Sequence, residues 1–280
     1  MTGQAKQNNS NHKEEQLLRA IASGNRPKPP NALSSTMAFA QRALLRIKHV
    51  PEQMFDVTVF PIIFLLMFTY LFGGAIAGST GEYLQFLLPG ILVMTVAQIT
   101  MYTGIDLNND IRKGIFDRFR TLPIWLPSAL VGALLVDVIR YSLASAIMIA
   151  LGLALGFRPE GGVMGVLGAV LLILVFSFSL SWIWTALGLV VRSEKSLMMV
   201  SFMVLFPLTF VSNVFVDPAT LPSWLRGFVE INPISILATA VRGLMHGNAT
   251  WGEIAWVFVV SAILVILFAP LTMYLYRNKE

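Results

Sequence analysis

The chain has 280 residues, of which 56% are hydrophobic and only 12% are charged, and its formal net charge is +5. A soluble domain is typically about 25% charged, so this chain has too little polar surface to cover a water-soluble globule. The composition excludes a soluble enzyme, a disordered chain and a nucleic-acid-binding module, and we expect no nucleic-acid partner.

The amino-terminal part of the chain differs in composition from the rest. Residues 1–34 are polar and contain several Asn, Ser and Pro residues, which predicts a disordered cytoplasmic tail. Residues 35–53 are basic, and their apolar residues recur at helical spacing: Met37, Ala40, Leu44 and Ile47. Such a segment before a membrane span usually lies in the membrane interface. We therefore predict an interfacial amphipathic helix that contacts membrane lipid, with a solvated linker helix as the alternative.

Residues 54–280 contain six long apolar runs. A bilayer core of about 30 Å needs about 20 helical residues, and each run reaches this length. The sequence therefore predicts an all-α membrane protein with six transmembrane helices. The spans are expected at residues 54–74, 83–105, 126–156, 164–191, 196–216 and 254–276.

Lys and Arg are unevenly distributed between the two sides of these spans. Sixteen of the 20 fall in segments that share one side of the membrane. Because loops rich in Lys and Arg stay in the cytoplasm, we expect a multi-pass protein of the cell (plasma) membrane with both termini cytoplasmic. The net charge is thus an orientation signal and does not indicate nucleic-acid binding.

The cytoplasmic connection over residues 106–123 is more than a simple loop. Asp110 is a plausible N-cap for a short amphipathic helix over residues 110–122. Its apolar face is formed by Ile111, Ile115, Phe119 and Leu122. This helix either packs on lipid headgroups or presents a contact ridge to a cytoplasmic protein partner.

The external connection over residues 217–253 contains a second short helix. Asn232 and Pro233 are typical of an N-cap and a first helical residue, and Gly247 is a natural C-terminal stop. Residues 233–246 are too few to cross a membrane, so an external re-entrant or interfacial helical hairpin is expected. Arg226, Glu230 and Arg242 either pair within this hairpin or face water.

Two ionisable residues, Asp137 and Arg140, lie deep in the third predicted span. Each costs about 2.5–3.5 kcal/mol at the centre of a membrane helix, so we expect them to form an intramembrane charge pair one turn apart. A structural role or a link to another span is one interpretation, and a role in substrate passage or gating is the other. No catalytic group accompanies them.

The second and fifth predicted spans carry adaptable and polar side chains that suit a cavity for large amphipathic molecules. Ordinary helix packing explains the same pattern, and the residues leave that choice open. The candidates are Met94, Gln98, Met101, Tyr102, Met203, Phe206, Thr209, Phe210 and Asn213. On the first span, an i,i+4 stripe of Phe60, Phe64, Phe68 and Phe72 is predicted to pack against another helix or lipid.

Several kinds of chemistry are absent from the sequence. It has no phosphate-binding P-loop motif and no Gly-Lys dipeptide. It has no cysteine, and His12, His49 and His246 are widely separated. We therefore expect no catalytic residues, no metal site and no cofactor in this chain.

Six passages together resemble one known family. They are residues 48–64, 72–80, 85–91, 110–125, 179–190 and 206–222, and the NPIS and RGLM runs within 232–245 complete them. Over residues 35–280 the chain resembles type-2 ATP-binding-cassette exporter permeases, and within them the daunorubicin/doxorubicin-resistance permeases of actinobacteria. The resemblance implies a bacterial protein and a six-span type-2 transmembrane domain over residues 54–280.

The resemblance also implies partners and roles. Such permeases form dimers with two copies of a separate ATPase subunit, which binds ATP and Mg and couples to the permease through a cytoplasmic helix. On this sequence the coupling residues are Lys113, Gly114, Ile115, Phe116, Asp117, Arg118, Phe119 and Arg120. The external hairpin is expected to cap the exit, and a substrate path bordered by spans two and five favours cavity lining for the candidates above.

The expected function is that of a permease subunit of an ATP-driven exporter that moves amphipathic drugs or antibiotics out of the cell. The subunit itself is not expected to be an enzyme, because it lacks a nucleotide-binding domain. An exporter of a lipid, glycolipid or polysaccharide with the same architecture is the alternative. A secondary transporter is disfavoured because it normally needs more membrane charges for ion coupling.

Overall fold

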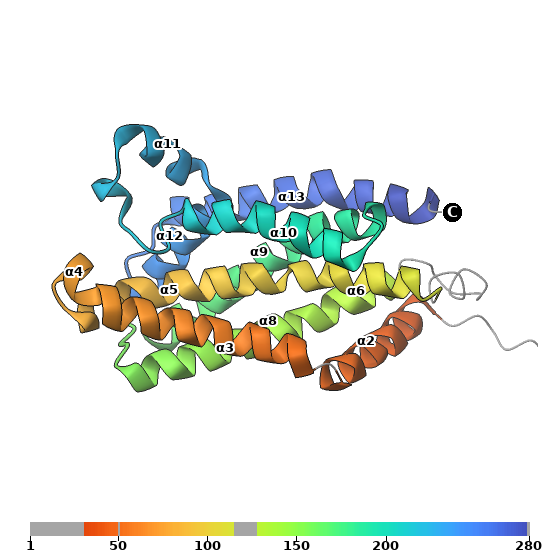
Figure 1. The fold of residues 1–280 in the computed structure, drawn as a ribbon, viewed down its shortest axis with the longest axis horizontal. Helices are drawn as coiled ribbons and strands as arrows, with labels where there is room; N and C mark the ends of the chain where they lie inside the picture. Colours follow the sequence, from red (N-terminus) through yellow and green to blue (C-terminus); the bar gives the residue numbers. More distant parts are fainter. Residues whose placement is uncertain (1–30, 50, 115–127, 279–280) are drawn as a thin grey trace, which may run out of the picture.

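The computed structural model describes residues 31–49, 51–114 and 128–278, where every regular element is a helix (Figure 1). Five helices there are long and apolar enough to cross a membrane: Val59–Ala77, Thr80–Arg112, Val131–Leu155, Gly162–Val190 and Trp251–Asn278. A bent helix pair would be a sixth span if it counted as one. The predicted class, an all-α membrane protein, is confirmed.

The second span lies at the centre of the bundle. It consists of α5 (Thr80–Ile99) and α6 (Met101–Arg112), and 83% of its most apolar stretch is buried, against 11% for α13 (Trp251–Asn278). In a membrane either lipid or protein can cover a helix that is apolar on all faces, so the burial of the second span reflects its packing. The helices α3, α8, α9, α10 and α12 pack against this span, whereas α13 packs on α9 and α12 at the periphery.

The second span also continues further than the sequence predicts. The expected end was residue 105, but α6 extends to Arg112, so Asp110 lies inside the helix and the prediction that it caps a new helix is wrong. Asn108 explains the extension, because its Nδ2 donates to the carbonyl oxygens of Gly188 and Val191, at 3.0 and 2.6 Å. The polar residues after Ile105 thus pack against a neighbouring helix instead of forming a loop.

The first span is built from three consecutive segments. They are α3 (Pro51–Met67), a π-helical turn η1 (Phe68–Phe72) and α4 (Gly73–Ala77), which ends at Gly78 in the left-handed conformation, with φ of 76°. Ser79 then caps α5 by accepting from the backbone N–H of Glu82. The predicted span at 54–74 is thus confirmed as helical, with a later end.

The amino-terminal amphipathic helix is present as α2 (Ala32–His49), which packs against α8 (Ser128–Leu155). A Cβ added at Gly132 of α8 would lie 2.8 Å from Cβ of Phe39 and 3.0 Å from the carbonyl oxygen of Thr36, so the missing side chain permits the close approach. The helix is confirmed, and its place in the membrane interface stays a prediction.

The fifth predicted span ends earlier than expected. After α9 (Gly162–Val190), α10 covers Glu194–Phe210, and the prediction of helix to residue 216 is corrected. The side chain of Asn232 ends α10, because its Nδ2 donates to the carbonyl oxygens of Leu208 and Val211, at 2.7 and 2.6 Å. At 17 residues, α10 is about 25 Å long and is not among the five spans above.

The external connection forms the predicted pair of short helices. After a 3-10 turn, η2 (Pro218–Thr220), the helices α11 (Ser223–Ile231) and α12 (Pro233–His246) meet at a bend of 77°. Asn232 caps α12 by accepting from the N–H of Ile234, and Gly247 ends it with a φ of 76°. The predicted N-cap, bounds and stop are confirmed.

The two ends of the bundle are distinct in Figure 1. One end holds α2, the end of α6 and the carboxyl terminus, whereas α4, α11 and α12 lie at the opposite end. The first described helix, α2, and the carboxyl end of α13 therefore lie at the same end of the bundle. The side of the membrane that this end faces stays a prediction.

α6 and α9 cross with their backbones almost in contact. A Cβ added at Gly104 would overlap the carbonyl group of Trp184, and one added at Gly188 would lie 2.5 Å from the carbonyl oxygen of Gly104. The indole Nε1 of Trp184 also donates to the hydroxyl of Thr100, at 2.7 Å. Small residues allow such close packing, which stabilises helices in membranes.

We predict that Gly104→Ala destabilises the protein by about 1–3 kcal/mol, the usual cost of overpacking, because the neighbouring atoms are backbone and have little freedom to move. Thermal unfolding of the purified protein measures the effect. Gly81→Ala in α5 is the matched control, since a Cβ there meets nothing within 4 Å. Equal melting temperatures for the two variants would contradict the close crossing.

Candidate functional site

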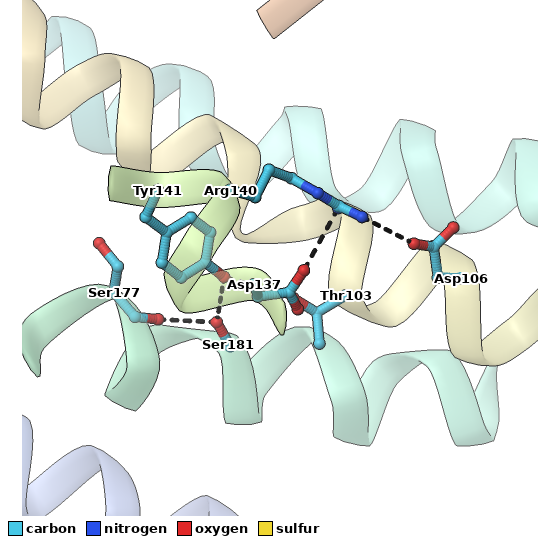
Figure 2. A network of polar contacts seen from close by, with 7 residues as sticks. All are labelled: Thr103, Asp106, Asp137, Arg140, Tyr141, Ser177 and Ser181. Carbon is cyan, nitrogen blue, oxygen red and sulfur yellow. Dashed lines mark hydrogen bonds and ion pairs between the residues drawn. The ribbon is translucent and has the colours of Figure 1, made fainter. Parts of the chain in front are cut away.

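A buried charge cluster joins α6 to α8, as Figure 2 shows. The guanidinium of Arg140 lies between two carboxylates: its Nη1 is 3.3 Å from Oδ1 of Asp137 and its Nη2 is 3.3 Å from Oδ2 of Asp106. Asp137 is 3% exposed and Arg140 is 8% exposed. The pairing expected from the i,i+3 spacing is present, and it extends to a second helix.

Hydroxyl groups extend this cluster to α9. Thr103 donates to Oδ2 of Asp137 at 2.5 Å, and the hydroxyl of Tyr141 lies 2.7 Å from Oγ of Ser181 (Figure 2). Ser181 donates in turn to the carbonyl oxygen of Ser177, at 2.7 Å. One polar network therefore links α6, α8 and α9 in a part of the bundle that is otherwise apolar.

The network suits a structural link better than a chemical reaction. Two carboxylates and one guanidinium neutralise each other in large part, and the hydroxyl of Thr103 donates to the second oxygen of Asp137. Sequence reasoning missed Asp106 because it ended the second span at Ile105 and so assigned this carboxylate to a loop. The i,i+3 spacing of Thr103 and Asp106 places both on one face only if the helix continues, and the contacts of α6 with its neighbours decide that it does.

Two adjoining hollows lie between α3, the α5–α6 span and α10, and we call them together the aromatic hollow. Both are lined by Phe60, Gln98, Met101 and Phe202, and their volumes are about 60 and 210 Å³. The smaller one also includes Phe64, Phe206, Thr209 and Phe210, and the larger one includes Tyr102. The structure thus brings together six of the nine substrate-path candidates.

Aromatic contacts connect the two sides of the aromatic hollow. Phe64 on α3 meets Phe210 on α10 edge to face, with 6.3 Å between ring centroids, and Phe206 stacks on Phe210 at 4.4 Å. Gln98 is half-buried, and its side-chain amide has no hydrogen-bond partner in the part of the chain that the structure describes. An apolar wall with one available amide is suited to holding a flat, largely apolar molecule.

Part of the phenylalanine stripe on the first span packs against other parts of the bundle, as predicted. Phe68 and Phe72 stack along their own helix, and Phe68 also packs against Phe215, with 4.7 Å between centroids, as the packing prediction implies. Phe60 and Phe64 also line the aromatic hollow, where Phe64 packs against Phe210 of α10. Sequence reasoning missed their place there, although the stripe itself was visible.

Three substrate-path candidates lie elsewhere. Met94 is fully buried in the core around α5, and Met203 is 78% exposed on the outside of α10; neither belongs to the lining of the aromatic hollow. Asn213 follows α10 and lies against α12, where its Nδ2 donates to Thr239 Oγ1 at 2.6 Å. These three predicted residues therefore do not line the aromatic hollow.

Of the predicted coupling residues, the structure describes two. Lys113 follows the last turn of α6, and Gly114 adopts a φ of 64°, which ends the helix. Ile115, Phe116, Asp117, Arg118, Phe119 and Arg120 lie outside the described residues, so their helix and its role stay predictions.

The charged residues of the bent pair divide into two groups. Arg226 and Glu230 form an exposed i,i+4 ion pair of 2.8 Å, as one of the two interpretations expected. Arg242 instead turns toward α5, where it stacks on Phe86 and donates from Nε to its carbonyl oxygen at 3.1 Å. Its Nη2 donates to the carbonyl oxygen of Asn213 at 3.0 Å, so Arg242 fixes α12 to its neighbours.

We predict that Arg140→Met lowers the free energy of unfolding by about 3–5 kcal/mol, because it leaves two carboxylates without their buried counter-charge. Arg226→Met is the control, and it should cost about 1 kcal/mol or less because its ion pair is exposed. Adding Asp137→Asn to Arg140→Met should recover part of the loss. Denaturant or thermal unfolding of the three variants measures this order, and similar losses for both arginines would contradict it.

Comparisons with known proteins agree with this architecture. Residues 34–246 match the model of the ABC-2 type transporter family. The chain is 53% identical to the daunorubicin resistance ABC transporter permease protein DrrB1 of Streptomyces coeruleorubidus, over 95% of this chain and 94% of that protein. It is 23% identical to the probable doxorubicin resistance ABC transporter permease protein DrrC of Mycobacterium tuberculosis, over 86% of this chain and 88% of that one. The family resemblance of the sequence passages is confirmed, and the chain belongs to the ABC-2 type transporter family as a multi-pass membrane permease.

Proposed function

We propose that this chain is the permease subunit of an ATP-driven exporter that moves amphipathic drugs out of the cell. The observation that carries the proposal is the aromatic hollow, which presents phenylalanine rings and the amide of Gln98 between α3, α5–α6 and α10. It occurs in a chain that is 53% identical to a permease named for daunorubicin resistance. A planar apolar drug with a few polar groups fits such a lining.

The small volume of the aromatic hollow in one chain argues for a second copy of the chain as a partner. Drug-sized sites usually enclose about 300–1,000 Å³, and the two hollows of one chain are smaller, at about 60 and 210 Å³. Next to them α10 exposes a row of large apolar side chains: Met199, Phe202, Met203 and Phe206. Two copies that meet near this row would enlarge the site, so we propose a homodimer with the substrate path between the copies.

A separate ATPase subunit, in two copies that bind ATP and Mg, is proposed to drive the change between inward and outward access. The end of the bundle that holds α2, the end of α6 and the carboxyl terminus is its proposed docking side and lies in the cytoplasm. The coupling segment follows α6 directly, and α6 carries Asp106 of the charge cluster and Met101 of the aromatic hollow. ATP binding shifts the permease between its inward-open and outward-open states, because the ATPases have a different affinity for each state.

We predict that Phe206→Ala and Gln98→Leu each reduce daunorubicin efflux from cells that co-express the permease and its ATPase, because they remove an aromatic wall and the available amide. A loss of roughly fivefold or more is expected if each contributes about 1 kcal/mol. Leu171→Ala is the control, because this exposed side chain of α9 lies outside the aromatic hollow. Unchanged efflux in both variants, or export of a labelled lipid in place of the drug, would overturn the drug assignment.

We predict that replacing both Phe116 and Phe119 by Ala abolishes drug-stimulated ATP hydrolysis, because these residues are the proposed apolar anchors of the ATPase contact. The assay uses the reconstituted complex, and membrane insertion of the permease is checked by immunoblot of washed membranes. Normal stimulation by the drug in a variant that inserts would place the coupling contact elsewhere.

A further inference from the structure

Another hollow lies between α11, α12 and α13, at the end of the bundle opposite to α2 and the carboxyl terminus, and we call it the hairpin hollow. Its volume is about 510 Å³, which is more than twice that of either part of the aromatic hollow and is in the range of small-molecule sites. No residue is shared between the two linings. The function proposed above makes no use of this hollow.

One buried polar atom in the lining of the hairpin hollow lacks a partner. Asn213 is 4% exposed, and its Nδ2 donates to Thr239, a residue that also lines the hollow. Its Oδ1 has no hydrogen-bond partner among the described residues. Buried amide oxygens are rarely left without a donor, so the lining offers an acceptor for a group that donates a hydrogen bond.

The charged side chains of the lining are both acidic. They are Glu230 of α11 and Glu253 in the first turn of α13. Glu230 uses Oε1 for Arg226, and Glu253 uses Oε2 to accept from the N–H of Thr250 at 3.0 Å. The second oxygen of each carboxylate accepts no hydrogen bond from the residues that the structure describes. The other nearby cation, Arg242, is turned away toward α5.

The rest of the lining is apolar or aromatic. Trp256 of α13 is 61% exposed, and Ile231 at the end of α11 is 79% exposed. An indole face attracts organic cations in addition to apolar groups. The lining therefore combines an acceptor at a buried position, negative charge and an aromatic surface.

We propose that the hairpin hollow is a binding site for an amphipathic ammonium compound, whose N–H groups reach the carboxylates and Asn213 Oδ1 while its apolar part lies on Trp256 and Ile231. The ammonium group belongs either to a free amphipathic amine or to the amine headgroup of a membrane lipid. This site goes beyond the proposed transport function, since binding here requires neither ATP nor an ATPase.

The two carboxylates can be neutralised with little risk to folding. Glu253 and Thr250 form a capping box, in which Gln replaces Glu without loss of the accepting oxygen. Glu230 and Arg226 are an exposed ion pair, which contributes little to stability. The double variant Glu230→Gln with Glu253→Gln therefore tests ligand binding separately from folding.

The absence of cysteine from the sequence allows a test that reports the place of binding. A single Ile231→Cys is introduced into the full-length permease in phosphatidylcholine nanodiscs, and its reaction rate with a neutral methanethiosulfonate reagent is measured. Dodecylamine, dodecanol or phosphatidylethanolamine is then added. Val163→Cys, at a residue that is 75% exposed and outside the lining, is the matched control.

We expect dodecylamine or phosphatidylethanolamine to slow labelling of Ile231→Cys but not of Val163→Cys, and dodecanol to have little effect. The concentration for half protection should rise about threefold to tenfold in the Glu230→Gln, Glu253→Gln background. Glu82→Gln with Glu160→Gln, which removes the same charge elsewhere, should leave it unchanged. Protection by the amine alone assigns a free amine, and protection by the lipid assigns a headgroup. No protection, or protection that is equal in both charge backgrounds or equal with dodecanol, would overturn the proposal. Because no ATPase is present, either result is independent of the transport assay.

Discussion

Gly104 and Gly188 let α6 and α9 cross with their backbones in contact, and the position of α6 depends on this crossing. The hydrogen bonds of Trp184 to Thr100 and of Asn108 to the end of α9 lie on either side of it along α6. In an apolar bundle, close backbone approach together with a few interhelical hydrogen bonds is the main source of helix association. The crossing therefore holds the central span, against which α3, α8, α9, α10 and α12 pack.

From this fixed position α6 takes part in two different sites. Thr103 and Asp106 contact the charged residues of α8, whereas Met101 and Tyr102 line the aromatic hollow beside α3 and α10. Because an α-helix is stiff over such a short distance, a displacement of its end near Lys113 would change both sets of contacts together. Because one packed helix takes part in both sites, it gives a physical basis for coupling between the Lys113 end of α6 and the aromatic hollow.

The two hollows differ in chemistry because different elements form them. Phenylalanine rings from α3 and α10 and a neutral amide from α5 line the aromatic hollow. The hairpin hollow combines carboxylates near the ends of α11 and α13 with a buried amide oxygen that follows α10. The short helix α11 and the first turn of α13 can carry charge, because they lie beyond the most apolar stretches, where a charged side chain is most costly.

The sequence by itself determined the class of the protein and most of its local structure. Long apolar runs identified the helices, and Asn232, Pro233 and Gly247 set the bounds of α12, because capping and hydropathy depend on neighbours in the chain. The charge pair of Asp137 and Arg140 was likewise visible from its spacing. Tertiary structure alone decided that α6 continues past Ile105, that Asp106 joins this pair, that Phe60 lines a hollow with Phe206, and that Asn213 lies against Thr239. Each of these depends on contact between residues far apart in the chain, and such contacts follow from how the helices pack and not from the pattern within any one of them.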